Sequence, residues 1–268
     1  MNDRVTVDIK DGVADVRLVR VDKMNALDNA MFAALVETGE RLKTEAGVRA
    51  VVLSGEGRAF CAGLDMSNFA QMASGSGRRS SETLVTAKRT AGGANHAQQA
   101  CMVWREIPVP VIAAVHGVAF GGGFQLMLGA DMRFVTADVR LAVLEIKWGL
   151  IPDMAGMALM RGLVRDDVCR ELTYTGRIFG GEEAVAMGLA TRVCADPRAE
   201  ALALAAEIAG KNPDAIRAGK RLLNLMTEGE QGDILLAESQ EQTALIGSPN
   251  QVEAVTANLQ KRAPQFAD

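Results

Sequence analysis

Histidine and paired cysteines are scarce in this chain of 268 residues, and positive charge does not exceed negative charge. Its 2 histidines cannot build a multi-histidine metal site, and its 4 cysteines contain no CxxC pair of the zinc or redox type. We therefore expect no metal and four reduced thiols. The formal net charge of -4 argues against nucleic acid or an anionic membrane as partner. Acid–base chemistry would then rest on carboxylates.

Targeting and membrane segments are not expected either. The first residues, MNDRVTVDIKDG, are polar and lack the apolar core of a secretory signal, which predicts a cytoplasmic protein. Residues 107–130 carry no charge and are long enough to cross a bilayer. However, Pro108, Pro110, Gln125 and several glycines divide this stretch into a strand, a turn and the start of a helix.

Common catalytic signatures are also missing. The chain has no GxxxxGK[ST] phosphate loop, no GxGxxG dinucleotide motif, no GxSxG nucleophile and no HExxH zinc motif. His116 is expected to be a turn residue rather than a base, and His96 is expected to lie on the surface. Cys61 has no base beside it, so we do not expect a nucleophilic thiol.

Apolar periodicity predicts an α/β body. Residues 5–9 and 13–19 alternate around a turn as a hairpin, and Asp28 is expected to cap a helix over 29–44. Further strands are predicted at 49–53, 109–115, 133–135 and 140–143. Further helices are predicted over 82–106, with an interruption at the residues AGG of 91–93, from within 117–123 to 129, from 155 and from 181. The linker-like segment 73–81 is expected to be a solvated connection or a mobile loop over a site.

Composition changes after Pro197, where Ala, Glu, Lys, Leu and Gln dominate. Helices are predicted over 197–211, 213–228, 232–246 and 250–262. We therefore divide the chain into a body, 1–196, in which units of strand, turn, strand and helix recur unequally, and a C-terminal helical region, 197–268.

Two glycine-bearing turns stand out as candidate sites. One is the segment RAFCAGLD at 58–65, and the other is GGGFQ at 121–125. Consecutive glycines at a helix start leave backbone N–H groups open and let a ligand approach the main chain. Two such N–H groups can polarise one carbonyl oxygen as an oxyanion hole, or the glycines can serve tight helix–sheet packing alone.

At these residues the sequence resembles the crotonase (enoyl-CoA hydratase/isomerase) superfamily. The matching segments, in family order, are 21–27 (VDKMNAL), 58–65, 110–125 with Ala130-Asp131, and 144–152. The resemblance implies a crotonase-like spiral of repeated ββα units and a C-terminal helical region for trimerisation, giving a homotrimer or a dimer of trimers. It also implies an acyl-CoA substrate, with coenzyme A entering as part of the thioester and no separate cofactor.

Carried over by motif position, the backbone N–H groups of Leu64 and Gly122 form the oxyanion hole. Hydratases of the family have two glutamates at the positions of Gln125 and Glu145. Here the first is an amide, which cannot exchange a proton near pH 7. Glu145 alone can still carry a proton from one carbon to another, which favours double-bond isomerisation over hydration, with Gln125 lining the site.

Asp153 adds a second carboxylate after Glu145 in the run EIKWGLIPD. The dienoyl-CoA isomerase branch of the family has Glu and Asp at this separation as proton donor and acceptor, although it also has an acid at the position of Gln125. Two carboxylates near one apolar pocket divide into one acid and one base. Alternatively, Asp153 is the N-cap of the helix expected from residue 155.

The resemblance also implies contacts with coenzyme A and the acyl chain. Lys23 matches a position near the CoA phosphates, and Lys261 resembles a C-terminal lysine that reaches the CoA of a neighbouring subunit. Each is otherwise a solvated surface charge. Arg78 and Arg79 are weaker candidates. The substrate site is expected to include Ala62, Asp65, Met66, Phe69, Met72, Trp148 and Leu150.

These residues predict an acyl-CoA enzyme that stabilises a thioester enolate, with Glu145 as proton shuttle. Isomerisation of an enoyl- or dienoyl-CoA double bond is the first expectation, and addition of water to trans-2-enoyl-CoA is the second. A weakly catalytic acyl-CoA-binding relative that acts in an assembly is the alternative from another class.

Overall fold

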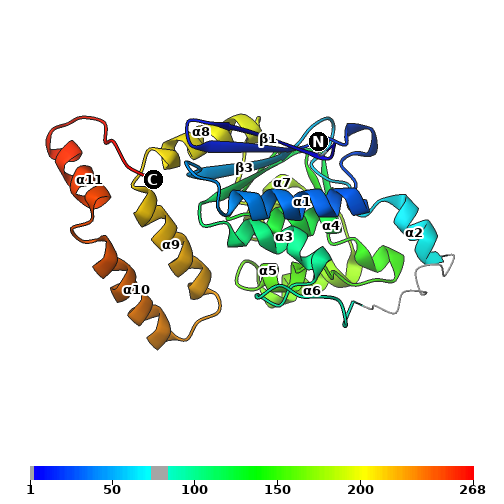
Figure 1. Cartoon of the computed structure of the whole chain (residues 1–268). Coiled ribbons are helices and arrows are strands. Elements are labelled where there is room, and N and C mark those ends of the chain that lie inside the picture. The colour runs from blue at the N-terminus through cyan, green and yellow to red at the C-terminus, as the bar shows by residue number, and fades with distance from the viewer. Residues whose placement is uncertain (1–2, 74–83) are drawn as a thin grey trace.

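The computed structural model describes residues 3–73 and 84–268, and its body consists of two sheets covered by helices (Figure 1). The segment 74–83 lies outside the described residues. It contains Arg78, Arg79 and most of the expected linker, whose interpretations stay predictions. The elements of the body are β1 (Val5–Lys10), β2 (Val13–Leu18), η1 (Val21–Lys23), α1 (Asn29–Leu42), β3 (Ala50–Gly55), α2 (Met66–Ala73), α3 (His96–Glu106), β4 (Val111–Val115), β5 (Val118–Phe120), α4 (Gly122–Leu128), β6 (Met132–Val135), β7 (Arg140–Ala142), η3 (Glu145–Trp148), α5 (Gly156–Met160), α6 (Asp166–Thr175), α7 (Gly181–Ala186) and β8 (Arg192–Val193).

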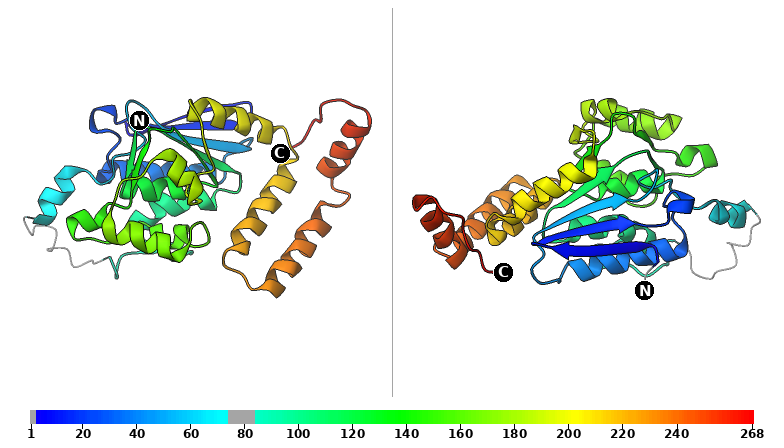
Figure 2. Two further views of the ribbon diagram at one scale, coloured as in Figure 1. Left: turned by 180° about the vertical axis from the view of Figure 1, so that it is seen from behind. Right: turned by 90° about the horizontal axis from the view of Figure 1, so that it is seen from above.

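The larger sheet has six strands in the order β1-β2-β3-β4-β6-β8. β1 and β2 form the predicted antiparallel hairpin, and all later neighbours pair in parallel. The strand β4, VIAAV, is buried along its whole length, as expected for a parallel strand that is covered on both faces. The helices α1 and α3 pack together on one face, and α8 (Pro197–Ala209) covers the other face with a row of small alanines (Figure 2).

A second, smaller sheet lies beside the first and consists of β5 and β7, which run parallel. Two isolated bridges extend it, Cys61 to Ala119 on one side and Leu141 to Phe179 on the other. Strand pairs therefore alternate between the two sheets before each helix, as in β4-β5-α4 and β6-β7-η3. This arrangement confirms the predicted recurrence of strand, strand and helix.

The ends of the helices follow from local capping, which confirms one prediction and corrects another. Asp28 caps α1, because its Oδ1 accepts a hydrogen bond from the Met31 N–H at 2.8 Å. Of the interrupted helix predicted over 82–106, only the part after the interruption is present, since residues 84–95 form turns and α3 starts at His96. Asn95 and Gln98 form a reciprocal capping box there, and the glycines before it favour turns.

All four predicted C-terminal helices are present. They are α8, already described, α9 (Pro213–Met226), α10 (Gln231–Leu245) and α11 (Pro249–Leu259). Whereas α8 covers the sheet, α9, α10 and α11 extend away from the body (Figures 1 and 2). The middle of α9 is anchored to the body by Lys220, whose buried Nζ donates to Asp131 Oδ2 at 2.8 Å and to the Val109 carbonyl at 2.9 Å.

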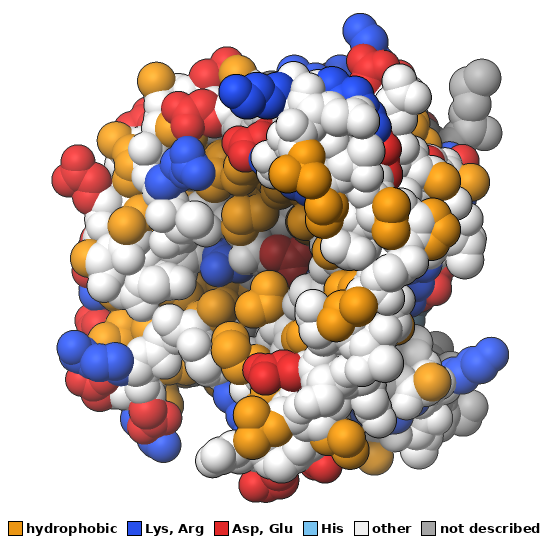
Figure 3. Space-filling model, turned by 90° about the vertical axis from the view of Figure 1, so that its left-hand side faces the viewer, with side chains coloured by type: hydrophobic (Ala, Val, Ile, Leu, Met, Phe, Trp, Pro, Cys, Tyr) orange, Lys and Arg blue, Asp and Glu red, His pale blue; other side chains and the backbone are white. Residues whose placement is uncertain are grey.

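The extended helices bury little of their apolar surface within one chain. Figure 3 shows apolar side chains around a hollow on the side of the molecule that these helices form. Large exposed apolar side chains on α9, α10 and α11 are Leu223, Met226, Leu235, Leu236, Val252, Val255 and Leu259. In the described ranges, every helix falls short of the length and apolar character that a bilayer span requires.

Candidate active site

The two glycine-bearing turns lie side by side because their strands pair in the second sheet. Cys61 bridges Ala119 in parallel, and the carboxyl-side continuation of each strand leads to Leu64 and to Gly122. The approach depends on Gly63, which has φ +88° and at which a Cβ would lie 2.5 Å from the Phe120 carbonyl oxygen. A side chain at this position would therefore force the two turns apart.

The backbone N–H groups of Leu64 and Gly122 are free. Leu64 bridges Leu27, but that pairing uses the Gly63 carbonyl and the Asp65 N–H, so the Leu64 N–H points away from Leu27. Gly122 is the first residue of α4, where an N–H has no partner in the helix. Among the described residues neither N–H donates a hydrogen bond. The chain thus offers two adjacent backbone donors to a ligand.

Gln125 and Glu145, both predicted site residues, are in direct contact. Gln125 is 1% exposed, and its Nε2 donates to Glu145 Oε1 at 2.6 Å. Its Oε1 accepts the backbone N–H groups of Met154 and Gly156, each at 2.9 Å. The amide therefore fixes one face of the Glu145 carboxylate. These two backbone partners were not predicted, because nothing in the sequence pattern identifies a loop N–H as an amide ligand.

Glu145 stands at the start of η3 and faces the glycine turn of α4. A Cβ at Gly121 would lie 3.2 Å from Glu145 Oε1, so the glycine leaves room for the carboxylate. Burial raises the pKa of Glu145, and the nearby charge of Asp153 also raises it, against hydrogen bonds to the carboxylate from its own backbone, from the Gln125 amide and from the Leu144 backbone. Glu145 Oε2 is buried and has no hydrogen-bond partner among the described residues. The hydrogen-bonding capacity of this oxygen is therefore unused by the described part of the chain.

Asp153 is not a helix cap. The helix α5 begins at Gly156, and its N-cap is Ala155, which has φ +69° and no side-chain hydrogen bond. The capping alternative for Asp153 is therefore wrong. Partial burial raises the pKa of Asp153, and its charge acts on Glu145. Two carboxylates with raised pKa values thus lie near each other, an arrangement that serves acid and base roles.

The predicted acyl-chain residues gather on α2 and η3. The rings of Phe69 and Trp148 stack with centroids 4.3 Å apart, which joins the two helices. Met66 and Trp148 are exposed by 62% and 41%. Asp65 differs from them, because its carboxylate accepts from Ser67 N and Oγ and pairs with Arg20, and these contacts lower its pKa to about 2. Its side chain therefore holds the start of α2.

The predicted CoA-binding residues divide into two groups. The Ala62 N–H donates to the Met24 carbonyl at 2.9 Å, which holds the loop that carries the exposed Lys23 against the first glycine turn. Lys261 follows α11, at the opposite end of the molecule from α2 (Figure 1). Within one chain it is therefore not brought together with the other candidates.

Arg58 is a candidate that the sequence analysis did not assign. A Cβ at Gly57 would lie 2.5 Å from Val21, so the loop before Arg58 touches η1, which ends at Lys23. Both cations are exposed on neighbouring loops. The signal was present, since Arg58 opens the matched segment 58–65.

The thiol of Cys61 and the imidazoles of His96 and His116 are not among the groups that form hydrogen bonds with Glu145 or Gln125 in the described residues. Cys61 is fully buried, donates to the Asn25 carbonyl, and burial raises its pKa to about 12, so it stays a thiol at neutral pH. His96 is exposed at the start of α3. His116 lies in a turn after β4, with Nε2 2.9 Å from the Gly57 carbonyl oxygen. The described ranges contain no group of three His, Cys, Asp or Glu residues arranged to hold a metal.

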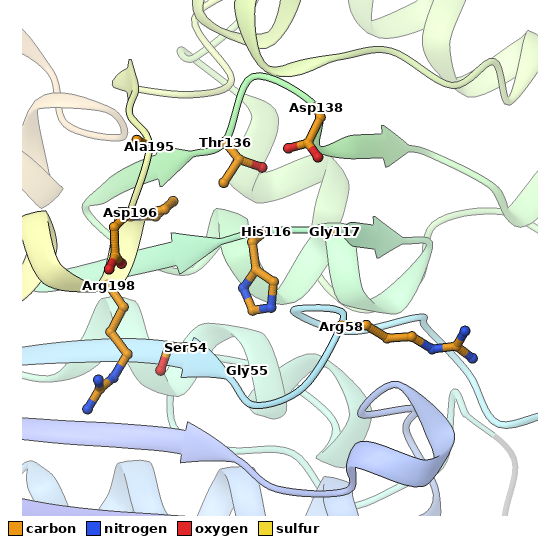
Figure 4. Close-up of a pocket in the computed structure, with 11 residues that line it drawn as sticks. Ser54, Gly55, Arg58, His116, Gly117, Thr136, Asp138, Ala195, Asp196 and Arg198 are labelled. Carbon is orange, nitrogen blue, oxygen red and sulfur yellow. The ribbon is translucent and has the colours of Figure 1, made fainter.

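A separate polar cavity of about 580 Å³ lies at the carboxyl ends of β3, β4 and β6 (Figure 4). Figure 4 shows Ser54 and His116 on these strand ends, with Arg198 at the start of α8. Arg198 is already paired with Asp15, and the lining carries acidic as well as basic groups. The lining does not include Glu145, Gln125 or Gly122, so this cavity is not the candidate active site.

Comparisons with known proteins agree with the geometry. The family model described as enoyl-CoA hydratase/isomerase matches residues 8–268. The peroxisomal Delta(3,5)-Delta(2,4)-dienoyl-CoA isomerase of Arabidopsis thaliana is 30% identical over 92% of this chain and 90% of its own. The mitochondrial dienoyl-CoA isomerase of Mus musculus is 29% identical over 93% and 77%.

A solved structure gives the same result for the fold. The crystal structure of an enoyl-CoA hydratase from Bacillus anthracis superposes with a TM-score of 0.87 at 28% identity, covering 98% of each chain. The crotonase-like spiral of ββα units, expected from the sequence, is thereby confirmed. The chain belongs to the enoyl-CoA hydratase/isomerase family.

Proposed function

We propose that this protein is an acyl-CoA double-bond isomerase that acts on 3-enoyl- or 3,5-dienoyl-CoA thioesters. The free N–H groups of Leu64 and Gly122 form the oxyanion hole and bind the thioester oxygen. Polarisation of this carbonyl acidifies the carbon next to it and stabilises the enolate. One such donor typically contributes about 2.7–4 kcal/mol of transition-state stabilisation.

The observation that carries this proposal is the carboxylate of Glu145, which the buried Gln125 amide holds and on which the charge of Asp153 acts. Glu145 is the base: it adjoins Gly121, the neighbour of the oxyanion donor Gly122, and its Oε2 has no hydrogen-bond partner within residues 3–73 and 84–268. Oε2 removes a proton from C2 of the acyl chain, and the electron pair of that C–H bond enters the conjugated enolate. The carboxylic acid of Asp153 then gives a proton to the far end of the conjugated system. The product double bonds lie closer to the thioester, and a solvent proton exchange between the two carboxyl groups resets the site.

The second candidate function is hydration of trans-2-enoyl-CoA. It is favoured by the hydratase of Bacillus anthracis among the structural relatives. Against it stands Gln125, because an amide whose oxygen already accepts two backbone N–H groups and whose nitrogen donates to Glu145 has no proton to transfer to or from a water. Hydration would then require Glu145 to make both transfers.

Incubation with thioesters in D₂O tests the proposal. We expect 3-enoyl- or 3,5-dienoyl-CoA to shift its double bonds with deuterium uptake, followed by proton NMR and by the absorbance of the conjugated product. Glu145→Gln should abolish both. The proposal fails if no thioester is isomerised, and crotonyl-CoA that gains water faster than any ester is isomerised would make the chain a hydratase.

We also propose that the exposed apolar surface of α9, α10 and α11 joins copies of the chain as a homotrimer or a dimer of trimers. Lys23 and Arg58 then contact the CoA phosphates of their own subunit, and Lys261 contacts CoA bound to a neighbour. Light scattering after size exclusion tests the assembly, since a monomer at micromolar concentration contradicts it. Lys261→Ala should raise KM for the CoA ester without lowering kcat.

A further inference from the structure

Gln125 is held so that its amide has one orientation. Its Oε1 receives two backbone N–H donors, from Met154 and Gly156, and backbone N–H groups cannot accept a hydrogen bond. A flipped amide would oppose its own NH₂ group to both donors. The Nε2 group must therefore face Glu145, to which it donates at 2.6 Å.

We propose, on the basis of the isomerase function above, that Gln125 is a positioning residue that holds Oε1 of Glu145 as a permanent acceptor and so confines proton transfer to Oε2. The structure supports both halves of this statement. Oε1 accepts from the amide, while Oε2 is buried and has no hydrogen-bond partner in the part of the chain that the structure describes. A proton on Oε1 would face the Nε2 hydrogens, so the acid form of Glu145 carries its proton on the side of the substrate.

The same amide also ties Glu145 to the turn that carries Asp153. The residues on the carboxyl side of Asp153 supply the two N–H groups that Gln125 Oε1 accepts. A Cβ at Gly156 would lie 2.7 Å from this oxygen, and Ala155 adopts φ +69°, so the turn closes tightly around the amide. Gln125 thus connects α4, η3 and the start of α5, and it sets the spacing of the two carboxyl groups.

The substitution Gln125→Glu tests the hydrogen bond that the Gln125 Nε2 group donates to Glu145, separately from the contacts of its Oε1. The introduced carboxyl retains an oxygen for the two N–H groups and replaces only the NH₂ that faces Glu145. While it keeps a proton it can donate to Oε1 as the amide does. When that proton is lost, two carboxylates oppose each other within hydrogen-bond distance and the contact breaks. We expect kcat/KM of the variant to fall at alkaline pH, so that its pH profile shows a decline that the wild-type profile lacks. Activity near neutral pH should be retained in part.

Gln125→Leu and an infrared titration test the idea without turnover. Removal of the donor should raise the pKa of Glu145 by about one to two units, because a hydrogen bond to a charged group is lost. The carboxyl band of Glu145 is identified from the difference between wild type and Glu145→Gln. Gln99→Glu is the matched control, since Gln99 is a buried amide that donates to Glu40 and Glu106 on α1 and α3. It should leave the profile of kcat/KM and the Glu145 band unchanged.

The outcomes separate the two proposals. If the wild type isomerises no thioester, the proposed function fails, yet the infrared titration still tests the role of Gln125. A Glu145 band that titrates at the wild-type pH in both Gln125 variants overturns the inference, even where isomerisation is confirmed. Should Gln125→Leu not fold, as judged by circular dichroism, the Gln125→Glu titration decides alone.

Discussion

Asp153→Asn tests whether Asp153 and Glu145 have separate roles, one as proton donor and the other as base. If Asp153 gives the proton to the far carbon and Glu145 removes the first one, the variant can still form the enolate but cannot complete the isomerisation. General acid–base transfer contributes about 10²–10⁴-fold, which corresponds to ~2.7–5.5 kcal/mol. We therefore expect isomerisation to fall about 100-fold or more while exchange of the C2 proton with D₂O continues.

The structure also predicts what this substitution does to stability. Asp153 caps no helix and has no hydrogen-bond partner among the described residues, so its replacement removes no structural contact. Because the folded state raises its pKa, the fold binds this proton more tightly than the unfolded chain does, and its contribution to stability declines as pH rises. At pH 7 the amide should leave the free energy of unfolding equal to or slightly above that of the wild type.

The assay follows both signals in one sample. Proton NMR of a 3-enoyl-CoA in D₂O reports loss of the C2 proton, and absorbance reports the conjugated product. Asp138→Asn is the matched control, because it removes the same charge from an exposed loop beside the separate cavity. The reasoning is refuted if Asp153→Asn isomerises within threefold of the wild type, or if exchange and isomerisation fall together.

Three further predictions follow from single contacts. Gly122→Ala brings a Cβ to 2.8 Å from Leu27 Cδ1 and so displaces the N–H donor. We expect kcat to fall about 10²–10³-fold in steady-state kinetics. An unchanged kcat would show that Gly122 is not part of the oxyanion hole. Lys220→Ala removes a buried ammonium group that donates to Asp131 and to the Trp104 and Val109 carbonyls, and it should lower the free energy of unfolding by about 2 kcal/mol in urea. A change below about 1 kcal/mol would mean that these contacts are dispensable. Cys61, with a pKa of about 12, should stay unmodified by iodoacetamide in the native protein at pH 8; rapid labelling seen by mass spectrometry would contradict its burial.

Most of the fold could be predicted because its signals are local. The alternation around residues 11–12, the apolar strand β4 and the cap at Asp28 each depend on neighbours in the sequence, and the structure confirms them. The segment before α3 could be predicted only in part, since the glycines at 92 and 93 indicate a break but the capping box at Asn95 decides where α3 begins.

The candidate site was predictable to a different degree. Glycine spacing and the matched segments identified Leu64, Gly122, Gln125 and Glu145. The orientation of the Gln125 amide depends on the loop that contains Met154 and Gly156, and no sequence pattern within α4 predicts this contact. Asp153 could be read either as a cap or as a catalytic acid, and the structure removed the first reading by starting α5 at Gly156.

The bridge between Cys61 and Ala119 has a consequence for how such an enzyme can diversify. The hydrogen bonds of this pairing, from Cys61 N–H to the Val118 carbonyl and from Phe120 N–H to the Cys61 carbonyl, tie the two turns to each other directly and do not involve α2. The chain between the two turns contains α2, where the exposed side chains that are expected to meet the acyl group reside. We therefore expect that substitutions in α2 can change the acyl-chain preference while the two donors proposed to stabilise the enolate keep their positions.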